Sequence, residues 1–202
     1  GSFNNTNNPL SMLIRNCIAA NNGLVGFTPN NAGGTPFNGQ YYNNFAFHNG
    51  YKHNLLGYDP TYGNGFLIFD FIGSPAPNEM YANNISYQNE HQNVWAIDNY
   101  IHTHNSWDIT GIEVNETDFI SLDWSQMRQT RKSDGSLPDI AFGKLASGSD
   151  LINAGIDVGL PFFGTAPDLG WSETFINQET PTNPLVVSSV IENAIPSRLE
   201  II

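Results

Sequence analysis

Cysteine and positive charge are the scarcest features of this 202-residue sequence. The single cysteine, Cys17, excludes an internal disulfide and a cysteine-rich zinc site. Seven Lys and Arg stand against nineteen Asp and Glu, giving a net charge of −12. This balance argues against nucleic acid as a partner, because phosphates require basic patches. No apolar run reaches the length of about eighteen residues that a membrane span needs, so none is predicted.

Good helix formers are also sparse, whereas Asn, Gly, Tyr and Phe are abundant. This mixture favours turns and strands over helices. Polar uncharged and aromatic surface of this kind suits carbohydrate, although many extracellular proteins share it. The length suffices for one domain with a sizeable core. The opening "GSFNNTNNPL" has no signal-peptide pattern, and we interpret residues 1–11 as an expression scar followed by a cut inside a longer gene.

Three segments repeat one another at irregular intervals. They are "RNCIAANNG" (15–23), "NNFAFHNG" (43–50) and "NNISYQNE" (83–90). Their aligned positions are Asn16, Asn43 and Asn83, then Ala19, Ala46 and Ser86, then Asn22, Asn49 and Asn89. One strand signal between Asn turns, repeated at this spacing, predicts stacked coils with parallel strands. We expect Ile18, Phe45 and Ile85 to face inward, and the corner Asn residues to adopt left-handed geometry and to bond their neighbours in the next coil.

Longer connections interrupt this pattern. Within "YDPTYGNGFLIFDFIGSPAPNE" (58–79), "FLIFDF" predicts a buried strand and "GSPAPN" a protruding turn. The repeat fades past residue 104, and "IAFGKLASGSDLINAG" (140–155) is compatible with a short helix.

Four ordered motifs follow: "DFISLD", "RKSDGSLPD", "KLASGSDLINAGIDVG" and "GTAPDLGWSE". Together they resemble the C-terminal part of bacterial polysaccharide lyases of family 9, the pectate lyase Pel9A type. The earlier "NCIAANNGLVGFTPNN", "YYNNFAFHNG", "YANNISYQN" and "HNSWD" resemble the last coils of the same domain. The resemblance covers about residues 12–173. It implies an all-β fold, a right-handed parallel β-helix (solenoid) that is N-terminally truncated here, in a secreted enzyme that cleaves pectic polysaccharide by β-elimination.

The tail has a resemblance of its own. Residues 174–202 form a linker or tail, in which "PTNPLVVSSVIENAIPSRLEII" (181–202) resembles the linker before a sorting domain of the bacterial type IX secretion system. This similarity implies a secreted or cell-surface protein of Bacteroidetes type. A plain surface tail is the alternative.

The chemistry of β-elimination needs two groups. A base takes the proton at C5 of the uronate, and a charge neutralises the adjacent carboxylate. In the resembled family, a Lys after a Gly-Asn-Gly-Phe motif and a calcium-binding Asp cluster do this on earlier coils. Here Gly63-Asn64-Gly65-Phe66 is followed by Leu67, and it lies after the "NCIAANNG" coil instead of before it. We therefore interpret this stretch as a wall of the fold and assign no catalytic residue and no metal ligand. Calcium is expected for the full-length parent, and no calcium site is evident in this chain.

Few residues remain as candidates for binding an acidic sugar. They are Arg15 and Lys52, the two cations of the repeat region, with Tyr51, Asn30 and Asn31. The family often has an acidic Asp-Gln-Asn-Asn run where "TPNN" (28–31) stands here. His48, His53, His102 and His104 are interpreted as surface or corner residues, because no third ligand has a useful spacing.

The leading hypothesis is thus part of a secreted lyase acting on pectate or rhamnogalacturonan, an acidic plant or algal cell-wall polysaccharide, and inactive alone. The alternatives are a non-catalytic carbohydrate-binding module and a structural surface module. The truncated first coil would expose Leu13, Ile14 and Ile18, so we also expect self-association through it.

Overall fold

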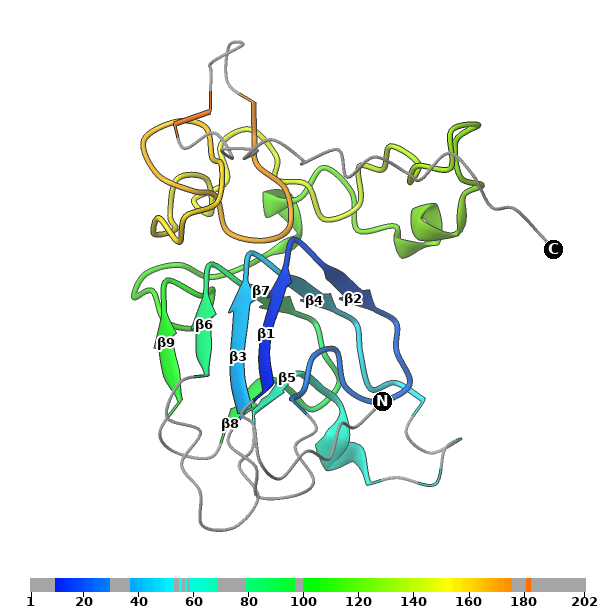
Figure 1. The fold of residues 1–202 in the computed structure, drawn as a ribbon. Coiled ribbons are helices and arrows are strands. Elements are labelled where there is room, and N and C mark those ends of the chain that lie inside the picture. Colours follow the sequence, from blue (N-terminus) through cyan, green and yellow to red (C-terminus); the bar gives the residue numbers. More distant parts are fainter. Residues whose placement is uncertain are drawn as a thin grey trace, which may run out of the picture.

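The computed structural model describes residues 10–29, 37–52, 55, 57, 59–68, 79–96, 100–175 and 181–182. Its named elements are parallel-paired strands and short 3₁₀-helices (Figure 1). The strands are β1 (Leu10–Arg15), β2 (Ile18–Ala20), β3 (Phe37–Tyr42), β4 (Phe45–Phe47), β5 (Asn64–Ile68), β6 (Met80–Ala82), β7 (Ile85–Tyr87), β8 (Gln92–Ala96) and β9 (Ile101–Thr103). The 3₁₀-helices are η1 (Pro60–Tyr62), η2 (Glu116–Asp118) and η3 (Trp124–Arg128). The fold is all-β, as predicted, and no helix in the described part of the chain could cross a membrane.

The strands form three sheets, which the chain visits in the same order. The first sheet has the order β1-β3-β6-β9, the second β2-β4-β7 and the third β5-β8. Phe27 joins the third sheet through an isolated parallel bridge to Phe66. The pairing aligns Ala19 with Ala46 and Ala46 with Ser86, as the repeat predicts. Equivalent residues of successive passes therefore lie side by side.

The corner between the first and second sheets confirms the expected role of asparagine. Asn16, Asn43 and Asn83 all have positive φ, between 51° and 59°, in the left-handed region that Asn tolerates better than most residues. His104 takes the same conformation at the fourth corner, with φ 51°. The side-chain amide of Asn83 also donates to Asn43 Oδ1 at 3.3 Å. Asn therefore supplies the sharp turn that keeps each second-sheet strand in register.

The interior between the sheets is filled from the first and third sheets. Tyr41 stacks on Tyr81 with ring centroids 4.6 Å apart, and Phe66 lies edge-on to Tyr81 at 6.2 Å. Ala46 is the residue of the second sheet that joins this cluster. All four side chains are at most 1% exposed. The second sheet thus presents small residues to the interior, which leaves room for the tyrosine rings opposite.

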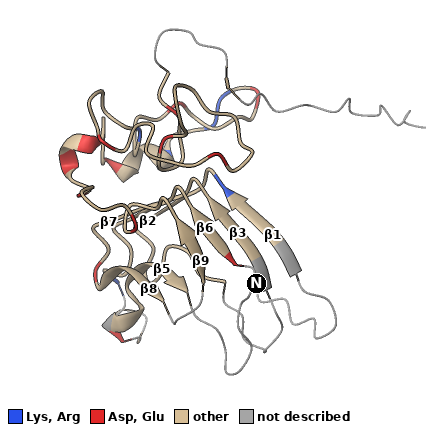
Figure 2. Cartoon of the chain, turned by 90° about the vertical axis from the view of Figure 1, so that its left-hand side faces the viewer, with Lys and Arg blue, Asp and Glu red and all other residues tan. Residues whose placement is uncertain are grey.

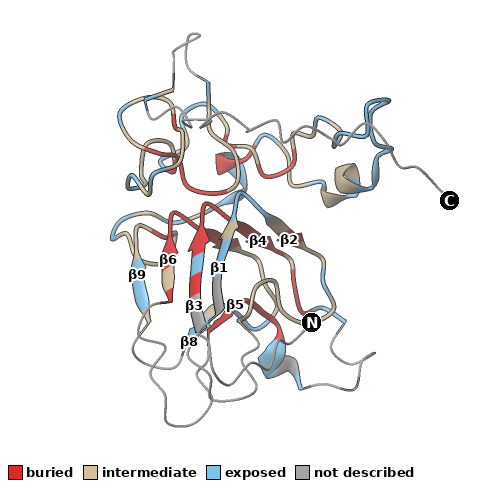
Figure 3. Ribbon diagram, viewed as in Figure 1, coloured by how far each residue is buried: buried red, intermediate tan, exposed pale blue. Residues whose placement is uncertain are grey.

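The expected inward direction of Ile18, Phe45 and Ile85 is wrong. These residues do stack in register, but they belong to a second core on the outer face of the second sheet. Residues 109–175, which we call the closing segment, cover that face and contribute Phe142 and Leu169 to the core, among others. Figures 1 and 3 show the closing segment lying across one end of the sheets, with buried residues on both sides of the contact. Because both faces of β4 are buried, alternation in the sequence could not tell the inside from the outside.

The corner asparagines also hold the closing segment. Asn43 Nδ2 donates to Asp168 O at 3.1 Å, and Asn83 Nδ2 donates to Ile156 O at 2.8 Å. The backbone amides of Ile156 and Gly170 donate back to Asn83. Polar anchoring at the corner therefore complements the apolar contact over the second sheet.

The short helix considered for residues 140–155 does not form. Gly143, Gly148 and Asn153 have positive φ, which ends any helical run. Phe142 and Leu145 instead make isolated β-bridges to Ser121 and Phe119. The proposed turn "GSPAPN" lies outside the described residues. The expected boundaries at residues 11, 173 and 174 and self-association through the first coil stay predictions.

Candidate functional site

Of the residues predicted to bind sugar, Arg15 lies apart from Tyr51 and Lys52. Arg15 is the exposed last residue of β1 and lies before the second sheet, whereas Tyr51 and Lys52 follow that sheet. Tyr51 is 49% exposed, stacks on His48 at 4.0 Å and donates to Gln88 O at 3.3 Å. Asn30 and Asn31 lie outside the described residues. Their part in binding stays a prediction.

The Gly-Asn-Gly-Phe stretch forms a wall of the fold, as the sequence indicates. All of β5 is buried, with Phe66 fully enclosed and Leu67 6% exposed. A Cβ on Gly65 would lie 2.7 Å from the carbonyl oxygen of Asn93, too close for any side chain there. Neither Leu67 nor its neighbours in β5 present an ionisable group.

A ladder of asparagine side chains runs along the buried corner of the coils. Asn44, Asn84 and Asn105 are each 0% exposed and occupy the same position in successive coils. Each Oδ1 accepts from the backbone N–H one coil earlier, at 2.9–3.0 Å. Each Nδ2 donates to a strand carbonyl, of Ile14, Tyr41 or Tyr81, and onward to the next rung. Buried amides satisfied in this way define a unique stacking register.

The ladder was missed by the sequence reasoning, although a signal was present. The doublets "NN" at 43–44 and 83–84 and "HN" at 104–105 place an Asn directly after each left-handed corner residue. The first coil has Cys17 at this position, where only its backbone N–H joins the ladder. A second ladder, predicted from the repeat, is confirmed: Asn22 N donates to Asn49 Oδ1 at 3.1 Å, and Asn49 Nδ2 donates to Asn89 Oδ1 at 2.9 Å.

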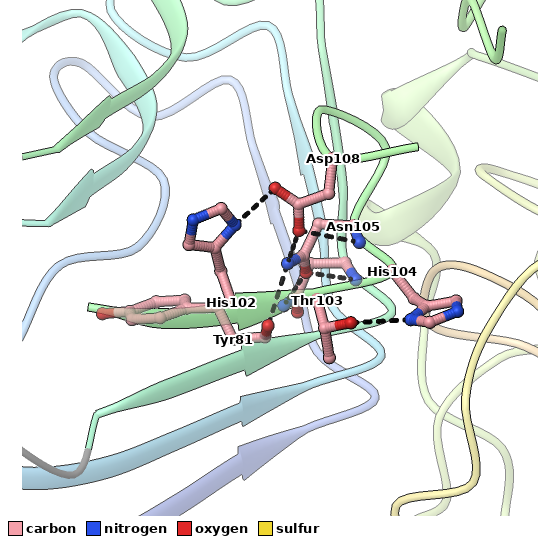
Figure 4. A network of polar contacts seen from close by, with 7 residues as sticks. Tyr81, His102, Thr103, His104, Asn105 and Asp108 are labelled. Atoms are coloured by element: carbon pink, nitrogen blue, oxygen red, sulfur yellow. Dashed lines mark hydrogen bonds and ion pairs between the residues drawn. The ribbon is translucent and has the colours of Figure 1, made fainter. Parts of the chain in front are cut away.

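Asp108 takes the place of the rung that would follow Asn105. Its Oδ2 accepts from Asn105 Nδ2 at 2.6 Å and from Asn105 N at 3.2 Å, the two bonds that another asparagine would make (Figure 4). Its Oδ1 lies 2.6 Å from Nδ1 of His102, which is 43% exposed. A carboxylate and a histidine therefore close the polar ladder where the coils end.

The histidine of this pair keeps one nitrogen for other partners. An ionised carboxylate only accepts, so Nδ1 carries the proton in the contact with Asp108. In neutral His102 the other nitrogen, Nε2, is then a proton acceptor on a half-exposed ring that stacks on Tyr100 at 4.4 Å. This geometry could bind a hydroxyl group. No Lys or Arg contacts the pair in any described interaction, so nothing there is shown to neutralise a uronate carboxylate.

Two of the four histidines lie at corners, as expected, and a third, His102, is exposed; His53 lies outside the described residues. His48 and His104 are left-handed corner residues, and the described bond of His104 is to Thr103 Oγ1 at 2.7 Å (Figure 4). Among the described residues no group of three or more His, Cys, Asp or Glu side chains could hold a metal ion. The calcium that the resemblance implies has no fitting site in this part of the chain, and we derive no step through it.

The buried tyrosines are held neutral. Tyr81 donates to Glu79 Oε2 at 3.2 Å, and Glu79 itself is 2% exposed. Burial, reinforced by the nearby Glu79 charge, raises the pKa of Tyr41, and burial raises that of Tyr81 as well. Neither phenol can serve as a base near neutral pH.

Two carboxylates approach each other inside the closing segment. Asp168 accepts from Asn153 N at 2.9 Å and from Thr174 N at 2.6 Å, whereas Glu173 accepts from Asp168 N at 3.2 Å. Burial, followed by the charge of Asp168, raises the pKa of Glu173 from 4.5 to about 7. Between about pH 4.5 and 7, Glu173 therefore keeps its proton in the folded protein, whereas the same carboxyl group is ionised in the unfolded chain.

Glu173→Gln is expected to remove this pH dependence. Because the raised pKa makes ionised Glu173 unfavourable, its contribution to stability is lost as pH rises through this window. We expect the free energy of unfolding of the variant, relative to the wild type, to be larger by about 1–2 kcal/mol at pH 8 than at pH 5, after discounting for partial exposure. Urea denaturation at both pH values measures it, with exposed Glu113→Gln as the control. If the difference in the free energy of unfolding between variant and wild type is the same at both pH values, the raised pKa of Glu173 is contradicted.

The family described as "Rhamnogalacturonan lyase-like, C-terminal" matches residues 99–191. Pectate lyase L of Dickeya chrysanthemi is 46% identical over 67 residues, which are 33% of this chain and 16% of that protein. Its counterpart in Dickeya dadantii (strain 3937) is 45% identical over 67 residues, with the same coverage. The crystal structure of pectate lyase Pel9A superposes with a TM-score of 0.56 and 26% identity, covering 80% of this chain and 35% of that one.

The chain is similar to the C-terminal part of pectate-lyase-like polysaccharide lyases. Sequence and fold agree on this, as the resemblance in the four motifs predicts. The chain spans about a sixth of the curated pectate lyases that it matches and about a third of Pel9A. The reaction and the substrate of a whole lyase are therefore a matter for proposal.

Proposed function

We propose that this pectate-lyase-like chain forms the last coils and the closing segment of a right-handed parallel β-helix lyase. The enzyme cleaves an acidic pectic polysaccharide, pectate or rhamnogalacturonan, by β-elimination and acts outside the cell or at its surface. The observation that carries the proposal is the set of parallel coils with an asparagine ladder that ends at Asp108, within a chain similar to Pel9A.

The role of this chain in the reaction is to complete and close the coil stack. The base and the calcium ion are supplied by residues outside it, which is consistent with the buried Leu67 after Gly-Asn-Gly-Phe. The ladder fixes the register of the coils, and the second core fixes the closing segment on them. A groove for a polymer needs both, because its walls are strands held at constant spacing.

The ultraviolet absorbance of the unsaturated uronate product tests this proposal. We expect no product from the purified chain with polygalacturonate or rhamnogalacturonan, with or without calcium. We expect a calcium-dependent rise when the chain is produced in one polypeptide with the segment that precedes it in its gene. The matched control is the same longer polypeptide with Asn84→Ala, which disrupts the ladder and should lower the rate.

Two outcomes would contradict parts of the proposal. A calcium-dependent rise in absorbance from the chain alone would show that it contains a complete site. Lys52 and the carboxylates of this chain would then be candidates for catalysis. No rise from the longer polypeptide, with glycan binding retained, would favour a non-catalytic carbohydrate-binding module.

A further inference from the structure

The few cations of this acidic chain are unevenly placed. Three of the seven Lys and Arg residues, Arg128, Arg131 and Lys132, fall within five consecutive positions. They lie in the closing segment, whereas the coils carry the isolated Arg15 and Lys52 (Figure 2). With a net charge of −12, the molecule as a whole repels polyanions. This cluster of three cations is thus where the described surface can attract a polyanion.

The cations are carried by a well-tied element. Asp123 caps the start of η3, where its side chain accepts from Ser125 N at 3.0 Å, and η3 ends at Arg128. Gln126 Oε1 accepts from the backbone N–H groups of Ala141 and Phe142, at 2.9 and 3.2 Å. Its Nε2 donates to Ser121 Oγ at 2.9 Å. Gln126 therefore fastens η3 to Ala141 and Phe142, and Phe142 belongs to the second core.

The turn that follows η3 is also closed by backbone bonds. Gly135 N donates to Lys132 O at 2.9 Å, and Lys132 N donates to Ser136 O at 3.0 Å. Asp134 Oδ1 accepts from Ser136 N at 2.9 Å. A loop fixed in this way loses little conformational freedom when it binds a ligand.

The two arginines keep most of their donors available. The Arg128 guanidinium lies over the Trp124 ring at 4.7 Å, a stacking contact that leaves its in-plane N–H groups open. Arg131 uses Nη1 to donate to Gly135 O at 3.0 Å and retains its other donors. Lys132 differs, because its Nζ lies 2.7 Å from Asp139 Oδ2 in an exposed ion pair. Arg128 and Arg131 are therefore the residues available to an outside carboxylate.

We propose that Arg128 and Arg131, with Trp124 beside them, form a binding site for a polyuronate chain. The class of polymer rests on the proposed function. Arginine pairs with carboxylates in two parallel hydrogen bonds, and a polyuronate offers a carboxylate on each sugar. The two residues are three positions apart, so their Cα atoms are at most about 11 Å apart, and one polymer chain can meet both. The exposed carboxylates of Asp123, Asp134 and Asp139 border the site, so its binding is weak and sensitive to salt.

The test measures binding of the 202-residue chain to polygalacturonate by affinity electrophoresis at low salt. The double variant Arg128→Gln/Arg131→Gln is expected to bind about tenfold more weakly, the loss of two charge-assisted contacts. The matched control, Lys144→Gln/Arg198→Gln, removes the same charge at other positions of the sequence and should weaken binding less than about twofold. Added salt should abolish the difference between the two variants.

Each alternative result overturns the proposal. The proposal of a dedicated polyuronate site is wrong if the wild type does not bind, or if both double variants are weakened equally. It is also wrong if the wild type binds polygalacturonate and double-stranded DNA with equal affinity. A failure of the proposed lyase function is seen separately, as absence of unsaturated product from the longer polypeptide. Loss of binding in Arg128→Gln/Arg131→Gln without any product from that polypeptide would support the site alone.

Discussion

Asn84→Ala should lower the free energy of unfolding by about 3–5 kcal/mol. The substitution leaves Asn44 N and Nδ2 without their acceptor and takes a donor from both Tyr41 O and Asn105 Oδ1. All of these groups lie in the corner where Asn44, Asn84 and Asn105 are fully buried, so water cannot replace the lost bonds without opening the coils. Urea denaturation of both proteins gives the difference directly.

Asn93→Ala is the matched control for this ladder variant. Asn93 is exposed in β8, and its side chain accepts a single long bond from Asn89 Nδ2 at 3.3 Å. We expect a change of less than about 0.5 kcal/mol there. If the Asn84 and Asn93 variants lost similar amounts of stability, the ladder would be a by-product of stacking and not one of its causes.

Phe45→Ala should cost about 3–5 kcal/mol of stability and should release the closing segment first. Phe45 is 0% exposed, and its ring lies 5.2 Å from that of Phe119 and 5.6 Å from that of Phe142. Hydrogen exchange can locate the damage. We expect the amides of Ile120 and Gly143, which are bonded within the closing segment, to lose more protection than those of β3.

This second prediction separates the two possible directions of Phe45. A side chain inside the coils, as the alternation in β4 first suggested, would expose the amides of β3 and β6 before those of the closing segment. Tyr51→Ala, which removes a half-exposed aromatic shortly after β4, is the control and should leave the exchange of Gly143 unchanged.

The sequence predicts the coils better than their surroundings. Left-handed Asn16, Asn43 and Asn83 and the Asn22–Asn49–Asn89 ladder follow from the chemistry of one residue type at one spacing. The inside of the second sheet could not be predicted, since the apolar cover over Phe45 comes from residues about a hundred positions later. Likewise, nothing near Asp108 in the sequence shows that it stands in for an asparagine of the next coil.

The candidate site was less accessible to sequence reasoning. Arg15, Tyr51 and Lys52 were selected as the rare cations and an aromatic of the repeat region, but the strand order places them on either side of the second sheet. Arg128 attracts attention only once η3 is seen to hold it over Trp124. The scarcity of cations selects candidates for binding an acidic sugar, whereas tertiary contacts decide which of these cations remain available to a ligand.

The two ladders also say where this architecture tolerates variation. In three successive coils the two rung positions are five residues apart: Cys17 to Asn22, Asn44 to Asn49, and Asn84 to Asn89. Partner strands of the first sheet, in contrast, are 27, 40 and 21 residues apart in sequence. All length change is therefore confined to the connections outside the two corners. For protein engineering, we expect insertions in the parts of these connections that lie outside the strands to be tolerated, whereas one residue inserted between the rungs would break the stacking register of that coil.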